Sequence, residues 1–379
     1  MLAHFSHHLL AALLIPLLPF IRDDFALNYT QIGWVVSAFT IAYGISQLPA
    51  GWLADRVGPR VVITIGISGV ALSGLLVGLS PTYIMMVVFL VLLGVMGGGY
   101  HPAASPLVSA SVEPKNRGRA LGLHQIGGTA SFFLSPLIAV AIATALGWRG
   151  SFVVLAIPTI VFGIVFYWVL GRRGYPKKAE PGIPKSHTET PSTSDRLRRL
   201  VAFLILSIAG MVLILSTISF IPLFVVDHFG VSEEAAAFLL ALVYSGGLWA
   251  GPLGGYLSDR LGRVPVILAM GLIAGPTIYL LTLVPFGWII YAVLIVIGMA
   301  MHLGMPVAEA YIISHTSERN RSTILGIYYV GSRGGAGVIT PVLGYLIDRL
   351  GFYTSFTIMS ATLVAVTLGC SIFLWGSRD

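Results

Sequence analysis

Long apolar segments alternate with short polar ones from one end of the chain to the other. Each apolar segment is long enough to cross about 30 Å of hydrocarbon as a helix, which takes roughly 20 residues. The segments are 3–21, 31–54, 60–79, 82–111, 118–146, 150–170, 200–226, 234–257, 263–284, 287–314, 322–346 and 353–375. Short strands of alternating polarity, the pattern of an outer-membrane barrel, do not occur. The pattern therefore predicts an all-α membrane protein with twelve transmembrane helices.

The polar loops indicate that the chain contains two copies of one design. Residues 51–60 and 255–263 each place an Asp-Arg pair in a glycine-rich loop. The offset that separates these loops also relates Asp23 to Asp227, Phe25 to Phe229, Pro102 to Pro306, Arg117 to Arg321, Gly122 to Gly326, Gly147 to Gly351 and Phe152 to Phe356. Such duplication is typical of transporters whose repeats rock about a central site. We predict two pseudo-symmetric six-helix bundles, 1–171 and 200–379, joined by a disordered cytoplasmic linker at 172–199.

Composition and charge agree with a bilayer protein. The 379 residues are 56% hydrophobic and only 10% charged, against about 25% charged residues in soluble domains. Nearly all of the Lys and Arg residues fall in alternate loops and at the two ends, which places these on the cytoplasmic side. The net charge of +7 is therefore interpreted as the positive-inside rule and not as a nucleic-acid surface. We expect a monomer in the cytoplasmic (inner) membrane, surrounded by the lipid bilayer, with both termini in the cytoplasm.

The loop Gly-Trp-Leu-Ala-Asp-Arg-Val-Gly-Pro-Arg at 51–60, repeated at 255–263, resembles the signature loop of the major facilitator superfamily. The resemblance covers essentially the whole chain. It implies two six-helix bundles around a central cavity lined by helices 1, 4, 7 and 10, and transport by rocker-switch alternating access. Two further segments, Tyr-His-Pro-Ala-Ala-Ser at 100–105 and Leu-His-Gln-Ile-Gly-Gly at 123–128, resemble the fosmidomycin-resistance-type branch.

The signature loops are expected to act as gates on the cytoplasmic side. Glycine permits a tight turn there, and a carboxylate at a helix end can meet the partially positive N-terminus of a neighbouring helix. By resemblance, Asp55 meets the start of helix eleven and Asp259 the start of helix five, which would latch the outward-open state. The gating motif comprises Gly51, Asp55, Arg56, Gly58, Arg60, Asp259, Arg260, Gly262 and Arg263, with Arg117 and Arg321 beside the expected contacts. The acidic residues of the outer loops, Asp23, Asp24, Asp227, Glu233 and Glu234, are interpreted as solvated caps.

Two charged residues fall inside predicted helices, where a charge costs at least a few kcal/mol and is a functional candidate by default. Glu309 lies roughly 13 Å deep on helix ten, and Arg333 lies roughly 18 Å deep on helix eleven, at 1.5 Å per residue. We expect the two to form an ion pair near the midplane. It is interpreted as a switch opened by a proton or an anionic substrate, or alternatively as a permanent pair that fixes helix packing. The matching positions of the first repeat are Ser105 and Thr129.

Other polar residues inside the predicted helices extend the candidate site. His101 forms a stripe with Ser105 and Ser109 on helix four, and His302 shares a face with Glu309 on helix ten. Histidine titrates near physiological pH and can carry coupling protons, although an isolated intrahelical histidine is more often a neutral hydrogen-bonding residue. His124 and Gln125 either line the cavity or bond across helices. The expected substrate and proton site comprises His101, Ser105, His124, Gln125, Tyr43, Gln47, Tyr244, His302, Glu309, Tyr329 and Arg333.

His4, His7 and His8 share one helical face at the start of the chain, a segment expected at the cytoplasmic interface. Imidazole is a common metal ligand, but no nearby carboxylate or cysteine completes a set, so we expect no metal. A phosphate-binding Gly-Lys-Ser/Thr loop is absent, which argues against direct use of ATP. No hydrolase constellation occurs either. We therefore expect no cofactor and no enzyme activity.

The sequence favours a secondary active transporter that moves a small organic solute. The leading hypothesis is proton-coupled efflux by antiport. The alternative is transport of an organic anion attracted by Arg333 and His101. A hypothesis of another class is a non-transporting sensor or lipid-handling protein on the same scaffold, which predicts no counterflow of any small solute.

Overall fold

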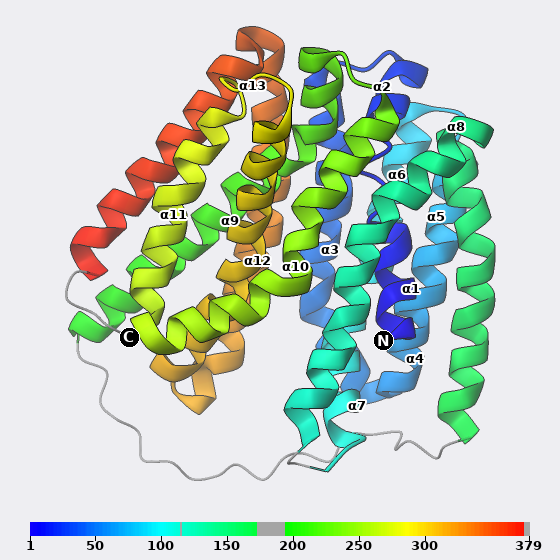
Figure 1. The fold of residues 1–379 in the computed structure, drawn as a ribbon. Coiled ribbons are helices and arrows are strands. Elements are labelled where there is room, and N and C mark those ends of the chain that lie inside the picture. The colour runs from blue at the N-terminus through cyan, green and yellow to red at the C-terminus, as the bar shows by residue number, and fades with distance from the viewer. Residues whose placement is uncertain (114–115, 173–193, 375–379) are drawn as a thin grey trace. The chain divides into compact units, whose positions relative to one another are not determined.

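A computed structural model describes residues 1–113, 116–172 and 194–374, and this part of the chain is helical throughout, without a strand (Figure 1). The first half contains α1 (Leu2–Ala11), α2 (Leu18–Phe25), α3 (Tyr29–Val57), α4 (Pro59–Thr64), a π-helical turn η1 (Ile65–Gly69), α5 (Val70–Gly78), α6 (Tyr83–Gly97), α7 (Tyr100–Ala110) and α8 (Arg117–Arg172). The second half contains α9 (Ser194–Phe229), α10 (Glu233–Leu261), α11 (Arg263–Leu280), α12 (Trp288–His315) and α13 (Glu318–Leu374).

The twelve predicted membrane crossings follow from these elements. The 56 residues of α8 and the 57 residues of α13 would span about 85 Å at 1.5 Å per residue, far more than a bilayer is thick. Each helix has non-helical backbone at one glycine, Gly147 or Gly351, and so holds two crossings. Nine helical stretches in the described ranges are long and apolar enough to cross. The two double crossings and the broken helix α1–α2 bring the total to twelve.

Two predicted crossings are broken where the sequence suggested continuous helices. The first, expected at 3–21, stops at Ala12 and resumes at Leu18, and the fourth, expected at 82–111, stops at Gly98 and resumes at Tyr100. Each break lies four residues before a proline, whose ring clashes with the carbonyl at that position and removes a hydrogen bond. Other prolines lie inside unbroken helices. A second helix breaker accompanies each of these two, Pro19 in the first case and the glycines at 97–99 in the second.

The predicted linker needs one correction. Residues 173–193 lie outside the described residues, but 194–199, which were expected to belong to the linker, form the first turns of α9. Leucine and arginine dominate these turns, and both are good helix formers. The helix therefore begins before the apolar pattern does.

Backbone geometry repeats between the two halves with the offset found in the sequence. Gly58 and Gly262 have φ angles of 89° and 91°, and Gly147 and Gly351 have 72° and 74°. Ala26 and Gly230, at the ends of α2 and α9, have 51° and 65°. Because side chains other than glycine rarely adopt such angles, the turns of the two repeats share a conformation and not only a residue type.

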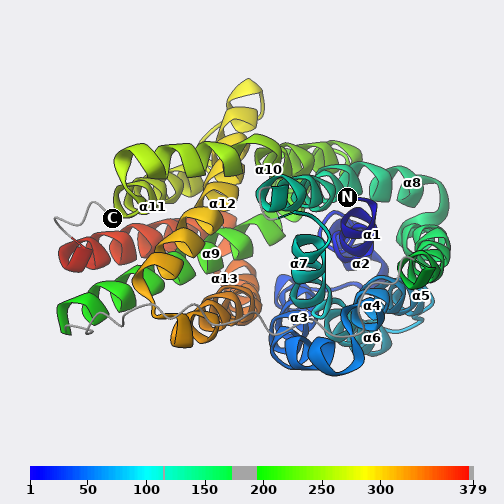
Figure 2. The same cartoon turned by 90° about the horizontal axis from the view of Figure 1, so that it is seen from below.

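Contacts divide the chain into two units that differ slightly from the two repeats. Unit 1 consists of Met1–Pro181 and Ile221–Ala241, and unit 2 consists of Gly182–Phe220 and Leu242–Asp379. Within unit 1, α1 packs along α5 and α8 (Figures 1 and 2). The end of α9 belongs to unit 1, and a polar network, described below, joins it to α2 and α3.

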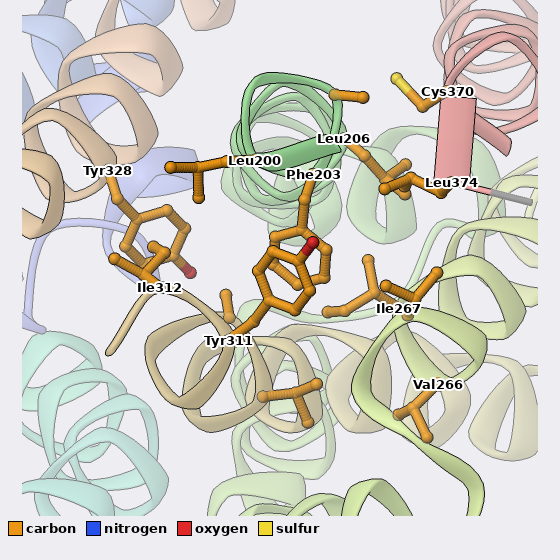
Figure 3. Close-up of a cluster of buried hydrophobic side chains, with 14 of the residues drawn as sticks. Leu200, Phe203, Leu206, Val266, Ile267, Tyr311, Ile312, Tyr328, Cys370 and Leu374 are labelled. Atoms are coloured by element: carbon orange, nitrogen blue, oxygen red, sulfur yellow. The ribbon is translucent and has the colours of Figure 1, made fainter. Parts of the chain in front are cut away.

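A cluster of buried side chains holds the helices of unit 2 together (Figure 3). Its centre is Phe203 of α9, whose ring stacks on Tyr311 of α12 at 3.7 Å between centroids. Ile267 of α11 and Leu374 of α13 close the cluster from other sides. Inside a bilayer such contacts stabilise through close packing, because lipid tails are as apolar as the side chains themselves. The cluster fixes α12 and α13, which carry Glu309, Tyr329 and Arg333.

The loop glycines give a direct test of the repeat geometry. We expect Gly58→Ala and Gly262→Ala each to cost about 1–3 kcal/mol in the free energy of unfolding, because alanine is strained at these backbone angles. Gly255→Ala is the matched control, since this glycine lies within α10 and an added methyl group would meet nothing within 4 Å. Thermal unfolding in detergent measures the difference. A Gly255→Ala effect as large as the other two would contradict the strain argument.

Candidate transport site

Unit 1 contains a cluster of imidazole rings at the contact of α1 with α7 and α8. His4, His7 and His8 are 2%, 0% and 8% exposed, so all three side chains are buried inside the unit. The sequence contains no sign of this burial, because the three histidines lie at the start of the first predicted crossing, 3–21, and their neighbours from other helices cannot be read from a local pattern. The three side chains share one face of α1, at spacings of three and four residues, and that face packs into the unit.

Each buried histidine of α1 meets a polar group of another helix. The Nδ1 of His4 lies 2.9 Å from the carbonyl oxygen of His124 in α8, and the Nδ1 of His7 lies 2.6 Å from that of Gly66 in the π-helical turn. The Nε2 of His8 lies 3.1 Å from the Nε2 of His101 in α7. The widened turn η1 therefore has a purpose in packing, since one of its carbonyl groups accepts a hydrogen bond from α1.

His101 and His124 join the cluster, as expected for residues of the candidate site. The ring of His124 stacks on that of His4 at 4.3 Å between centroids, with 9° between the planes. Tyr100, next to His101, stacks in the same way on His7, also at 4.3 Å. The break before α7 places both residues against α1. Tyr43 lies at the edge, 6.4 Å from the His7 ring.

Three other predicted residues of unit 1 lie apart from these ring contacts. Gln125, the neighbour of His124, is exposed, and Gln47 and Ser105 are half-buried. Among the described residues, these three take no part in the hydrogen bonds that hold the imidazole cluster together. Their contribution to a substrate site stays a prediction.

Unit 2 holds the two charged intramembrane residues, and the expected ion pair between them is absent from its described contacts. The carboxylate of Glu309 instead accepts a hydrogen bond from the hydroxyl of Tyr329, at 2.8 Å. Arg333 lies one helical turn beyond Tyr329 on α13 and shares its face. The sequence estimate placed Arg333 about 5 Å deeper than Glu309, which is one turn of helix. Glu309 therefore bonds to Tyr329, the residue of α13 at the same estimated depth.

Arg333 is half-buried and has no carboxylate or hydrogen-bond partner among the described residues of its unit. Its positive charge acts on three neighbours, Tyr244, His302 and Tyr328. The Nδ1 of His302 lies 2.9 Å from the carbonyl oxygen of Gly298, one turn earlier in α12, which is the bond of a neutral structural histidine.

The arginines of the gating motif are held within their own units. Arg60 donates from Nε to the carbonyl oxygen of Tyr167 at 2.8 Å, and Arg263 donates to the hydroxyl of Ser314 at 2.7 Å. Arg56 and Arg260 lie over the rings of Trp52 and Tyr256. Arg117 donates to the carbonyl oxygen of Ser109.

The two expected latches stay predictions. Asp55 and Asp259 are exposed, and each would have to meet a helix of the other unit. The side chain of Arg321 lies outside the described residues.

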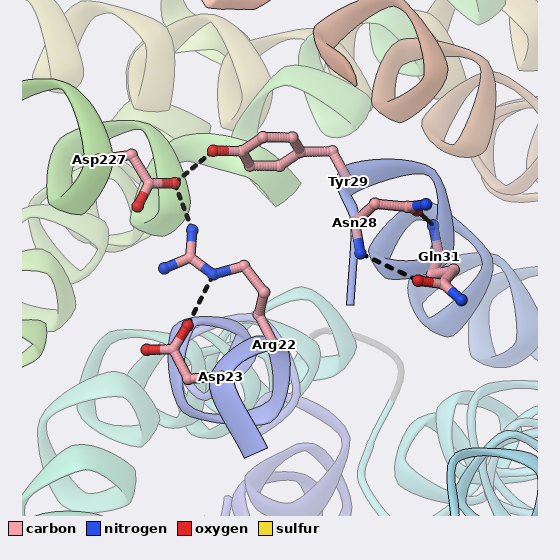
Figure 4. A network of polar contacts seen from close by, with 6 residues as sticks. All are labelled: Arg22, Asp23, Asn28, Tyr29, Gln31 and Asp227. Atoms are coloured by element: carbon pink, nitrogen blue, oxygen red, sulfur yellow. Dashed lines mark hydrogen bonds and ion pairs between the residues drawn. The ribbon is translucent and has the colours of Figure 1, made fainter. Parts of the chain in front are cut away.

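A polar network at the ends of α2 and α9 was not expected (Figure 4). Arg22, at the end of α2, forms ion pairs with Asp23, at 2.9 Å, and with Asp227 of α9. The hydroxyl of Tyr29, in the first turn of α3, donates to the same carboxylate of Asp227 at 2.5 Å. Asp227 is thus not a solvated cap, and Asp24 is paired as well, with Arg149 at 2.7 Å. The matching of Asp23 with Asp227 in the repeat was the one signal in the sequence that pointed here.

Helices long enough to cross a membrane, two repeats with the same turns and polar groups inside the helices define a multi-pass transporter of small solutes, not an enzyme. The chain belongs to the Major Facilitator Superfamily, whose family model matches residues 1–247 and 216–379. This confirms the resemblance of the signature loops and the predicted all-α membrane fold.

Known proteins with similar sequences are transporters or resistance proteins. The chain is 25% identical to the probable sulfoacetate transporter of Cupriavidus necator, over 94% of this chain and 87% of that protein. It is 24% identical to the fosmidomycin resistance protein of Escherichia coli, over 92% and 85%. Its fold resembles a crystal structure of a POT family transporter in complex with 5-aminolevulinic acid, with a TM-score of 0.81 and 16% identity over 98% of this chain and 94% of that one.

The polar network around Asp227 can be tested by a double-mutant cycle. Arg22 and Asp227 have only 18% and 24% of their side chains exposed, so we expect Arg22→Gln and Asp227→Asn to show an interaction energy of about 0.5–3 kcal/mol in the free energy of unfolding. The combination of Arg22→Gln with Asp24→Asn is the control, because Asp24 pairs with a different arginine. If the effects of the first pair are additive, the ion pair between Arg22 and Asp227 contributes nothing to the free energy of unfolding.

Proposed function

We propose that this chain is a proton-coupled transporter of small organic anions that works by rocker-switch alternating access in the cytoplasmic membrane. The observation that supports this most is Arg333, a half-buried guanidinium group inside a membrane helix without a carboxylate partner among the described residues. A charge in that position is costly and marks a substrate or ion pathway. The resemblance to a probable sulfoacetate transporter agrees with an anionic substrate, since sulfoacetate carries a sulfonate and a carboxylate.

Arg333 is the proposed anion-binding group. A guanidinium presents several N–H donors in a planar fork that fits the oxygens of a carboxylate or sulfonate bidentately. Tyr244, His302 and Tyr328 lie within electrostatic range of it and supply polar and aromatic groups nearby. Because Glu309 bonds to Tyr329 instead, an incoming anion does not have to displace an internal carboxylate. His101, also expected to attract an anion, belongs to unit 1, and its contribution stays a prediction.

Glu309 is the proposed carrier of the coupling proton. Its carboxylate accepts a hydrogen bond from the hydroxyl of Tyr329, a residue one helical turn from Arg333 on α13. A proton on Glu309 removes a negative charge close to the anion site, so protonation and anion binding favour each other through electrostatics. Such a linkage couples the two fluxes, because each ligand stabilises the state that binds the other.

The alternating exposure of this site requires a gate at each end. The Arg22–Asp227 network is the proposed outer gate, since it joins the two repeats at the ends of α2 and α9. The signature loops with Asp55 and Asp259 are the proposed inner gate. Opening one set of polar contacts while the other forms would expose the centre to one side at a time.

A second candidate, proton-driven efflux by antiport, is favoured by the resemblance to the fosmidomycin resistance protein. The two candidates differ in the direction of the proton relative to the solute. An imposed pH gradient across proteoliposomes distinguishes them, because symport accumulates the solute on the side that protons enter and antiport expels it from there. A sensor without transport activity would show no counterflow of any solute.

The role of Arg333 can be tested with sulfoacetate counterflow in proteoliposomes. We expect Arg333→Lys to weaken sulfoacetate binding at least about 10-fold and Arg333→Ala more, because loss of a charge-assisted hydrogen bond costs about 1.5–3 kcal/mol. Arg349→Lys is the matched control, since Arg349 lies at the end of a helical segment and stacks over Tyr345. Unchanged binding in Arg333→Ala would refute the anion site.

Glu309 has a separate signature. We expect Glu309→Gln to keep solute exchange but to lose accumulation driven by a pH gradient, because glutamine keeps the shape and cannot exchange a proton. Tyr329→Phe removes the hydroxyl donor alone and should weaken coupling while leaving accumulation measurable. Glu233→Gln, in the first turn of α10, should behave as wild type. Accumulation of normal size in Glu309→Gln would place the coupling proton elsewhere.

A further inference from the structure

The imidazole cluster of unit 1 has features that neither the proposed anion site nor the gates require. One ring nitrogen from each of His4, His8 and His101 lies within 4.8 Å of the other two. The first two are buried and belong to α1, whereas His101 belongs to α7. The sequence analysis expected no metal because it found no carboxylate or cysteine near His4 and His8. The third ligand is instead an imidazole more than 90 residues away in the chain.

Hydrogen bonding fixes how His4 presents its ring. The His4 Nδ1 faces the carbonyl oxygen of His124, and because a carbonyl only accepts, this nitrogen carries the proton. The neutral ring therefore has its lone pair on Nε2, which is buried without any hydrogen-bond partner among the described residues. A metal-binding histidine almost always donates its other N–H to a carbonyl or carboxylate in this way. A buried lone pair with no donor is otherwise unfavourable.

The other two rings have the separation that ligands of one metal ion have. Tetrahedral Zn²⁺ with Zn–N distances of 2.0–2.1 Å places its nitrogen ligands about 3.3–3.4 Å apart. The Nε2 atoms of His8 and His101 are 3.1 Å apart. Two neutral imidazoles reach this distance only if one donates a proton to the other, whereas a cation between them uses both lone pairs. The His4 nitrogen lies within 4.8 Å of both, so a bound ion would draw the three rings closer together.

We propose that His4, His8 and His101 form a binding site for a divalent transition metal ion of the zinc type. Three neutral nitrogen ligands suit Zn²⁺, Co²⁺ or Ni²⁺ rather than Mg²⁺ or Ca²⁺, which prefer oxygen. The fourth coordination position stays open for water or another ligand. Because the ligands come from α1 and α7, a bound ion fastens the first helix to the segment after the break in the fourth crossing. The site does not depend on the proposed anion transport.

Gly128 of α8 leaves room for the His4 ring. A methyl group at this position would lie 2.5 Å from Cε1 and 2.7 Å from Nε2 of His4, closer than carbon atoms pack. Gly128→Ala should therefore displace the metal-binding nitrogen without changing any of the three ligands. This variant separates ring position from ligand identity.

The test is titration of the chelator-treated, full-length protein in detergent with ZnCl₂, followed by isothermal calorimetry. We expect one Zn²⁺ per chain, and a loss of affinity of at least about 100-fold in His4→Gln, His8→Gln and His101→Gln. Loss of a residue that only supports a ligand costs about 10–100-fold, so loss of a ligand itself should cost at least as much. Gly128→Ala should also weaken binding. His302→Gln, a histidine of unit 2 with an intrahelical bond, should bind Zn²⁺ as wild type does. Equal affinity in all these proteins would overturn the proposal.

A second measurement needs no variant and so does not depend on whether each one folds. X-ray absorption at the zinc edge of the loaded wild-type protein should show three imidazole ligands at about 2.0–2.1 Å. Co²⁺ in place of Zn²⁺ should give the intense visible bands of a four-coordinate ion. Fewer than three imidazoles, or an octahedral Co²⁺ spectrum, would show that the rings form only a hydrogen-bonded cluster.

Discussion

The hydrocarbon of a bilayer offers no hydrogen-bond partners, and the polar contacts between the helices follow from this constraint. A polar or charged side chain inside the bilayer must find its partner on another helix, or it costs several kcal/mol. His4 and His7 meet this demand at carbonyl groups of α8 and of the π-helical turn. Glu309 meets it at the hydroxyl of Tyr329. Arg333 stands out because its guanidinium is the charged group of this region that the described residues leave without a carboxylate.

The irregular backbone serves the same demand. His7 and His8 of the first crossing lie against Tyr100 and His101, the residues that follow the interruption in the fourth crossing. The breaks before Pro16 and Pro102 and the widened turn at Ile65–Gly69 are deviations that cost hydrogen bonds within helices. The widened turn recovers part of this cost, because the carbonyl oxygen of Gly66 accepts a hydrogen bond from His7. Non-α geometry of this kind in membrane helices is typical of functional regions.

The sequence alone predicted whatever depends on local composition, and it missed whatever depends on tertiary contacts. Apolar length located the crossings, and repeated glycines located turns such as those at Gly58 and Gly262, because only glycine suits their backbone angles. The partner of Glu309 was predicted wrongly, since depth estimated along two helices could not separate Tyr329 from Arg333 one turn further on. The contact of His8 with His101 and that of Arg22 with Asp227 join residues far apart in the chain. No local pattern specifies such pairs.

Comparison of the repeats suggests how one backbone came to hold two kinds of chemistry. The offset that relates the loops carries His4, His8 and His101 of the first repeat onto Ile208, Val212 and Met305 of the second, and carries Glu309 and Arg333 back onto Ser105 and Thr129. The turns agree to within a few degrees at Gly58 and Gly262, yet no chemically active side chain in these sets is shared. The imidazole cluster lies in the first repeat, and the two charged residues of the predicted membrane segments lie in the second. The proposed anion and proton sites therefore lie on α12 and α13, whereas the proposed metal ligands lie on α1 and α7.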